Sequence, residues 1–107
     1  MGRKPQYRGT AIGAALMNIQ WTSKALSDLS RLYDFLQPIN KIAAAKTVQS
    51  LTSAPDILLS QPRIGERLDQ FAGREVRRLL VGHYEMRYEV TSTTVYILRM
   101  WHTRESR

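Results

Sequence analysis

Residues 84–90 constrain the fold of this chain most strongly, because their sequence YEMRYEV places an apolar or aromatic side chain at every second position. Charged residues fill the positions between, and this strict alternation predicts a half-buried β-strand whose aromatic side faces the core. The preceding Gly82-His83 pair predicts a two-residue hairpin turn, since glycine tolerates the left-handed conformation that such turns need. Pairing around this turn sets Arg78 opposite Arg87 on the outer face.

A second tight turn at Thr91-Ser92 predicts a third strand, in which Val95 pairs with Tyr88. A loop longer by one residue would move every side chain of this strand to the other face. In the predicted register the outer face mixes apolar and charged side chains: Val76, Arg78, Leu80, Glu85, Arg87, Glu89, Tyr96, Leu98, Met100 and His102. An apolar cluster among charges indicates a partner surface, unless the N-terminal residues or the loop before the sheet cover it. The register also brings glutamates diagonally close to the opposed arginines, whose repulsion they can offset.

Two helices are predicted before these strands. After a short strand at residues 18–22, Thr22 or Ser23 supplies a side-chain oxygen that caps the first helix. Its apolar positions follow the 3.6-residue period: Ala25, Leu26, Leu29, Leu32, Tyr33 and Leu36. Its charged positions fall on the solvated side: Lys24, Asp28, Arg31 and Asp34.

Gln37-Pro38 ends this helix, because the residue before a proline is pushed out of the α region. Asn40 can cap a second helix, and the predicted inner positions are Ile42, Ala45, Val48, Leu51 and Leu58. Small residues at positions 43–45 allow the two helices to approach closely as an antiparallel hairpin. Pro55 removes a backbone hydrogen bond and clashes with the preceding turn, so we expect a kink or break near Ala54.

These patterns predict an α+β fold: a short N-terminal strand, an antiparallel helix hairpin, a loop at residues 60–73 and a three-stranded antiparallel meander. Residues 1–16 contain basic residues but no acid, and are expected to be a flexible basic extension or a start-site artefact. Met17 stands directly before the first strand, so residues 17–107 form the predicted domain.

The chain of 107 residues has a formal net charge of +7, which suits binding to nucleic acid or to an acidic protein. It has no cysteine, so disulfides, thiol nucleophiles and cysteine-based metal sites are excluded. We expect no metal site and no cofactor. No apolar run approaches the ~20 residues of a membrane-spanning helix, and a cytoplasmic location is therefore expected.

Four segments together resemble the RelE/ParE superfamily of type II toxin–antitoxin toxins: WTSKALSDLSRLYDFL, QPRIG, REVRRLLVGHYEMRYEV and ILRMWHTRES. The resemblance covers roughly residues 18–107 and rests on the order of several weak motifs. It implies a toxin that a cognate antitoxin neutralises, by wrapping it with a helix and an extended segment. The superfamily divides into RelE-like enzymes, which cleave mRNA on the ribosome, and ParE-like toxins, which poison DNA gyrase.

Departures from the RelE-like pattern favour the ParE-like branch, and whether the chain is an enzyme is left open. RelE-like enzymes need an acid, a base and cations that stabilise the attacked phosphate. Here Val76 stands where that pattern has a basic residue, Glu85 stands where it has an arginine, and the terminal helix with a catalytic tyrosine is missing. A ribosome-dependent mRNA endonuclease is the alternative function, and an interaction module without toxicity is a third.

The expected site residues follow from this comparison. The residues expected to bind the target are Arg74, Arg78, Arg87, His102 and Arg104. No catalytic residue is assigned; an endonuclease would use Arg78, Arg87, His102 and Arg104, with ribosome and mRNA as partners. The residues expected to bind the antitoxin are Leu80, Tyr96, Leu98 and Met100. The simpler interpretation of His102 is a polar residue that ends a strand, and that of His83 is a turn residue.

Overall fold

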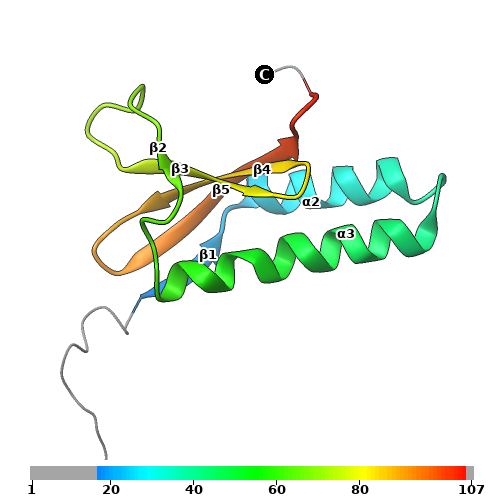
Figure 1. Cartoon of the computed structure of the whole chain (residues 1–107), viewed down its shortest axis with the longest axis horizontal. Helices are drawn as coiled ribbons and strands as arrows, with labels where there is room; N and C mark the ends of the chain where they lie inside the picture. The colour runs from blue at the N-terminus through cyan, green and yellow to red at the C-terminus, as the bar shows by residue number, and fades with distance from the viewer. Residues whose placement is uncertain (1–16, 106–107) are drawn as a thin grey trace, which may run out of the picture.

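The architecture is a five-stranded sheet with a helix hairpin on one face, and the computed structural model describes residues 17–105 of the chain (Figure 1). The elements in chain order are β1 (Asn18–Trp21), α2 (Ser23–Leu36), α3 (Lys41–Ser53), the 3-10 helix η1 (Ala54–Leu59), β2 (Glu66–Arg67), β3 (Val76–Val81), β4 (Tyr84–Val90) and β5 (Thr94–His102). The predicted α+β fold is thus confirmed. The extension predicted at residues 1–16 lies outside the described residues.

The helices begin and end where local chemistry predicts. The Thr22 hydroxyl accepts a hydrogen bond from the Ala25 N–H and caps α2, and the Asn40 side chain accepts one from the Ala43 N–H and caps α3. The α2 helix ends directly before Gln37, as predicted, but Gln37 itself stays in the α region, so the expected shift of this residue out of that region is wrong. At Pro55 the chain tightens from the α3 helix into η1, which confirms the break expected near Ala54.

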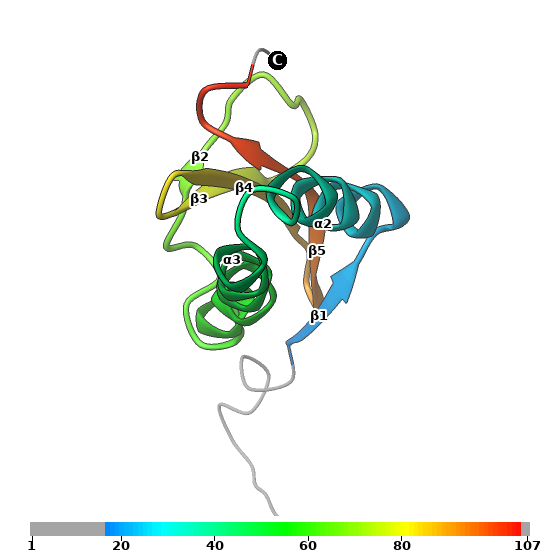
Figure 2. The same ribbon diagram turned by 90° about the vertical axis from the view of Figure 1, so that its right-hand side faces the viewer.

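The sheet has the order β1-β5-β4-β3-β2, so it is larger than the predicted meander. The β1 strand pairs parallel with β5, and every other pair is antiparallel. The loop predicted at residues 60–73 contains the short strand β2, in which Glu66 pairs with Arg78 and Arg67 with Arg77. Figure 2 shows both helices on one side of this sheet, and α2 packs along β5.

The register of β3 against β4 is the predicted one, with Arg78 opposite Arg87. The register of β4 against β5 is different. Val90 pairs with Val95 and Tyr88 with Ile97, so the connection is longer than the predicted turn. Leu98 is then an extra residue in a β-bulge, after which Arg87 pairs with Arg99.

This bulge changes the faces of the last residues of β5, because one inserted residue reverses the alternation. Met100, predicted on the outer face, pairs with Met86 and is completely buried in the core. His102 pairs with Tyr84 on the helix side, and Trp101 pairs with Glu85 on the outer face. The outer-face positions predicted for Met100 and His102 are therefore wrong.

The core lies between the hairpin and the sheet, and its largest completely buried side chains include Leu51, Leu58, Met86, Tyr88 and Ile97. Four assignments on the helices are wrong. Asp28 is buried and not solvated, whereas Leu26, Ile42 and Ala45, predicted on the inner side, are exposed. The hairpin projects beyond the end of the sheet (right in Figure 1), so Ile42, near its tip, has no sheet to pack against.

Gly65 generates a prediction about the core. Its N–H donates a hydrogen bond of 2.9 Å to the Tyr88 hydroxyl, and a Cβ at this position would lie 2.5 Å from the Arg78 carbonyl oxygen and 2.6 Å from the Tyr88 hydroxyl. We expect Gly65→Ala to lower the free energy of unfolding by about 1–3 kcal/mol, measured by urea denaturation. In a Tyr88→Phe background the same change should cost less, because one of the two clashing oxygens is gone. A Gly65→Ala variant as stable as the parent protein would contradict this packing.

Candidate functional site

Glu85 lies at the centre of the outer face of the sheet and joins the two opposed arginines. Its carboxylate oxygens lie 3.4 Å from Arg78 Nη1 and 3.0 Å from Arg87 Nε, and the residue is buried. The prediction that a glutamate offsets this repulsion is confirmed for Glu85. Arg78 also binds Glu66 at 2.7 Å, so the ion pairs extend from β4 to the edge strand β2.

Arg74 binds Glu89 at 2.8 Å at the other end of this face. Hydrogen bonds and charge from Glu89 raise the pKa of Arg74, and those from Glu66 raise the pKa of Arg78. Three arginines expected to bind the target, at positions 74, 78 and 87, therefore each already hold a carboxylate of this chain. A phosphate would have to compete with these carboxylates for the same guanidinium groups.

Two aromatic rings, neither of them predicted at this position, complete the outer-face network of ion pairs. The Arg87 guanidinium carbon lies 4.8 Å from the centroid of the Trp101 ring and 5.8 Å from that of the Phe71 ring. Both distances are in the range of cation–π attraction. Trp101 was missed because only the bulge at Leu98 brings it to the outer face. The segment that carries Phe71 thus covers part of this face.

His102 is the last residue of β5, and Arg104 lies in the turn that follows. The His102 ring contacts the Tyr84 ring edge-on at 5.2 Å between centroids and stacks on the His83 ring at 6.0 Å. The Arg104 N–H donates a hydrogen bond of 3.1 Å to His102 Nδ1. In this bond Nδ1 is the acceptor, so the contact uses its lone pair.

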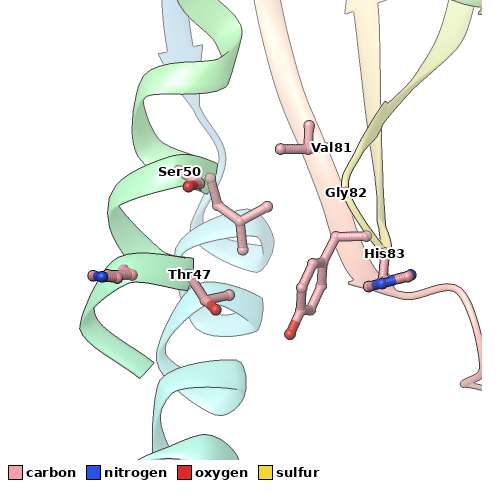
Figure 3. Close-up of a pocket in the computed structure, with 8 residues that line it drawn as sticks. Thr47, Ser50, Val81, Gly82 and His83 are labelled. Atoms are coloured by element: carbon pink, nitrogen blue, oxygen red, sulfur yellow. The ribbon is translucent and has the colours of Figure 1, made fainter. Parts of the chain in front are cut away.

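Two hollows open between the hairpin and this end of the sheet. One of about 600 Å³ is lined by Arg31, Leu32, Phe35, Leu36, Tyr84, His102, Arg104 and Glu105. The other, of about 290 Å³, is lined by Lys46, Thr47, Ser50, Leu51, Val81, Gly82, His83 and Tyr84 (Figure 3). Tyr84 lines both hollows.

A buried carboxylate fixes this end of β5 to the hairpin. Asp28, 4% exposed, accepts hydrogen bonds from Arg99 Nε at 2.7 Å, from Arg99 Nη2 at 3.1 Å and from the Met100 N–H at 3.0 Å. Arg31, one turn further along α2, binds Glu105, which in turn accepts a hydrogen bond of 2.6 Å from the His102 N–H. We call this chain of contacts the Asp28–Glu105 staple. It holds the turn that carries His102 and Arg104.

Opposing effects act on the pKa of Asp28. Burial favours the neutral acid, but hydrogen bonds from Arg99 and Met100 and the charges of Arg99 and Arg31 together outweigh it. The pKa of Asp28 therefore lies below its usual range. Asp28 is ionised at neutral pH, as the bidentate contact with Arg99 requires.

The structure does not bring the expected endonuclease residues onto one face. Arg78 and Arg87 lie on the outer face, whereas His102 lies on the helix side of β5 and Arg104 lies in the turn that follows. Among residues 17–105 no group of three or more metal-ligating side chains could hold a metal ion. No helix in the same range is long and apolar enough to cross a membrane.

The residues expected to bind an antitoxin also divide. Leu80 is exposed on the outer face, and Tyr96 and Leu98 are partly exposed. Met100 is buried, so it cannot contact a partner without opening the core.

Known proteins match almost all of the described chain. The family model for the ParE toxin of the type II toxin–antitoxin system parDE matches residues 19–107. A curated relative, Toxin RelE2 of Caulobacter vibrioides, is 32% identical over 87 residues, which cover 81% of this chain and 96% of the relative.

Solved structures give the same picture. A chromosomal ParDE toxin–antitoxin system from P. aeruginosa matches with a TM-score of 0.70 and 26% identity, over 82% of this chain and 97% of the other. The archaeal RelE–RelB complex from Pyrococcus horikoshii, with a TM-score of 0.62, 15% identity and coverage of 85% and 99%, supports the fold alone. The toxin–antitoxin complex RelBE2 from Mycobacterium tuberculosis has a TM-score of 0.51 and 26% identity, over 80% of this chain and 96% of the other.

The Asp28–Glu105 staple generates a prediction about stability. We expect Asp28→Asn to lower the free energy of unfolding by about 2–3 kcal/mol at pH 7, since it leaves Arg99 without its carboxylate. The contribution of Asp28 should be present above about pH 4, the unfolded pKa of an aspartate, and should be lost as the pH falls through its lower folded-state pKa. Urea denaturation across pH 2–7 measures both effects.

The matched control is Asp34→Asn, because Asp34 lies on the same helix but is exposed. It should change the free energy of unfolding by less than about 0.5 kcal/mol. Equal effects of the two substitutions would show that Asp28 has no special role.

Proposed function

Because this chain belongs to the ParE toxin family of type II toxin–antitoxin systems, we propose that it arrests growth by inhibiting DNA gyrase and that a cognate antitoxin keeps it silent. The observation that supports inhibition by binding is the outer-face ion-pair network, in which Glu85 occupies the space between Arg78 and Arg87. A surface neutralised in this way suits contact with a protein better than cleavage of RNA. A gyrase inhibitor acts in the cytoplasm.

The alternative is a ribosome-dependent mRNA endonuclease. The name of a curated relative, Toxin RelE2, is consistent with this function. Attack of a 2′-hydroxyl on its phosphate needs an acid, a base and cations at the phosphate. Here a buried carboxylate lies between the two central arginines, and His102 faces the helix side. These features disfavour the endonuclease, which would require a rearranged site.

We place the antitoxin on Leu80, Tyr96 and Leu98, the accessible members of the expected set. Leu98 is the bulged residue of β5, so its side chain is not committed to a regular position in the sheet. The likeness to solved toxin–antitoxin systems supports an antitoxin as a partner of this chain. On this proposal Met100 contributes only as a core residue beneath that surface.

Purified protein tests the proposed target directly. We expect it to block supercoiling or to stabilise cleaved DNA when it is added to gyrase and plasmid, and in parallel to leave translated mRNA uncut. No effect on gyrase at stoichiometric excess would exclude the proposal. Codon-specific cuts in mRNA, lost in His102→Ala or Arg87→Ala, would establish the endonuclease instead. Growth without arrest after induction of the toxin alone would identify an interaction module without toxicity.

The antitoxin surface is tested by introducing a charge on it. We expect Leu98→Asp to weaken binding of the co-expressed antitoxin by at least about tenfold, because a carboxylate replaces an apolar contact. The melting temperature of the isolated toxin should change little, since Leu98 is partly exposed. Leu26→Asp is the matched control, an exposed leucine on α2 that should bind normally. If Leu98→Asp still pulls down the antitoxin as well as the parent protein does, the proposed contact between the antitoxin and Leu98 is wrong.

A further inference from the structure

The two edges of the sheet differ in how well they are protected against pairing with another strand. One edge is β2, which consists of two charged residues, Glu66 and Arg67. The other edge is β1, whose four residues include no charge and no proline. Natural proteins protect edge strands with charged side chains, prolines or very short length, because the unpaired backbone groups of an edge can bind another strand. By these criteria β1 is the less protected edge.

The free side of β1 presents the backbone groups of two residues. The N–H groups of Asn18 and Thr22 donate hydrogen bonds of 3.0 and 3.1 Å to carbonyl groups in or next to β5. Because successive residues of a strand direct their backbone groups to opposite sides, Ile19 and Trp21 direct theirs away from β5. Among residues 17–105, β5 is the only neighbour of β1 in the sheet, and Figure 2 shows β1 at its rim. The backbone groups of Ile19 and Trp21 therefore have no partner strand.

The sequence around this edge carries no charge, although the chain as a whole has a net charge of +7. Residues 9–23 include no lysine, arginine, aspartate or glutamate. A large net charge opposes self-association, most strongly where cations of two copies would meet. The free edge of β1 contributes no such cation, so two copies can meet there without directly opposed charges.

The edge is also complementary to a second copy of itself. Two antiparallel β1 strands centred on Gln20 would place Ile19 of each copy opposite Trp21 of the other. Facing residues in such a pair exchange both of their N–H···O=C hydrogen bonds, so this register satisfies the free backbone groups of both strands. The side chains of Ile19 and Trp21 already pack against the core, whereas the Gln20 side chain is exposed. Pairing therefore needs no rearrangement of the core.

From these features we propose that this protein forms a dimer through the free edge of β1, in which a two-fold axis at Gln20 joins the two sheets. The dimer goes beyond the proposed function, because it requires neither gyrase nor an antitoxin. Facing residues of paired strands lie on the same face of a sheet, so both helix hairpins would lie on one face of the joined sheet. A two-fold contact of this kind is closed and produces a dimer, not a fibre.

Other occupants match this edge less well. Nucleic acid binds through cations that neutralise phosphates, and an acidic protein segment also needs cations, but the edge offers none. A second copy supplies an equally uncharged edge in a register that pairs every free group of Ile19 and Trp21. The contact involves few residues, so we expect a reversible dimer with a dissociation constant weaker than about 1 μM.

Gln20 provides the test, because the two-fold axis places it opposite its own copy. Its side chain is exposed, so a charge can be introduced there without entering the core. Full chains with Gln20→Lys and with Gln20→Glu are studied separately and as an equimolar mixture. The matched control is Gln49→Lys, which adds the same charge at an exposed glutamine of α3. Sedimentation equilibrium measures the dissociation constant, hydrogen exchange measures the protection of the β1 amides, and the melting temperature reports on the fold.

We expect the parent protein to dimerise, and the amides of Ile19 and Trp21 to exchange more slowly as its concentration rises. Each Gln20 variant alone should weaken the dimer by at least about tenfold, because two like charges then face each other. The mixture should restore the dimer, since a lysine then faces a glutamate. The Gln49→Lys control should dimerise within about threefold of the parent protein. The melting temperatures of dilute samples should agree.

A parent protein that stays monomeric at millimolar concentration would overturn the proposal. So would a Gln20→Lys variant that dimerises as well as the parent protein, because the interface would then lie elsewhere. A mixture as monomeric as its two components would exclude the two-fold contact at Gln20. A monomeric parent protein whose antitoxin affinity falls on Gln20→Lys substitution would assign the edge to the antitoxin instead.

Discussion

The carboxylate of Asp28 is the contact on which the position of the last residues of β5 depends. The helical pattern of the sequence predicts that Asp28 is solvated, but in the structure it is buried. There its carboxylate binds Arg99 and the backbone N–H of Met100. Both partners follow directly after the bulged residue Leu98, so the carboxylate fixes the strand at the point where its alternation reverses. Removing it would leave the buried Met100 N–H without an acceptor and the partly exposed Arg99 guanidinium without its carboxylate.

Three consequences follow from this one anchored bulge. Met100 enters the core, Trp101 reaches the outer face beneath the Arg87 guanidinium, and His102 turns towards the hairpin. The core, the outer face and the hollows beneath the hairpin are therefore coupled through three successive residues of β5. The Asp28–Glu105 staple extends this coupling to the turn after β5.

The cations on the outer face of the sheet and those at its end differ in whether they form ion pairs. On the outer face glutamates and aromatic rings surround the arginines, so the charges contribute to the cohesion of the sheet. At the end of the sheet Lys46 and Arg104 flank apolar hollows, and no ion pair within the described range involves either of them. A positive net charge alone does not reveal this division, because it depends on which acids lie beside which bases.

Local chemistry in the sequence determined the helix boundaries, the break at Pro55 and the pairing of β3 with β4. Each of these depends on a cap, a proline or a turn that acts within a few residues, and the structure confirms them. The order of motifs also indicated the family, which the match over residues 19–107 establishes. Only the tertiary structure decided the face of Met100, Trp101 and His102, the burial of Asp28 and the exposure of Ile42. The physical reason is that one extra residue in a strand reverses every later side chain, and the bulge is held by contacts between residues about 70 positions apart, which no local pattern records.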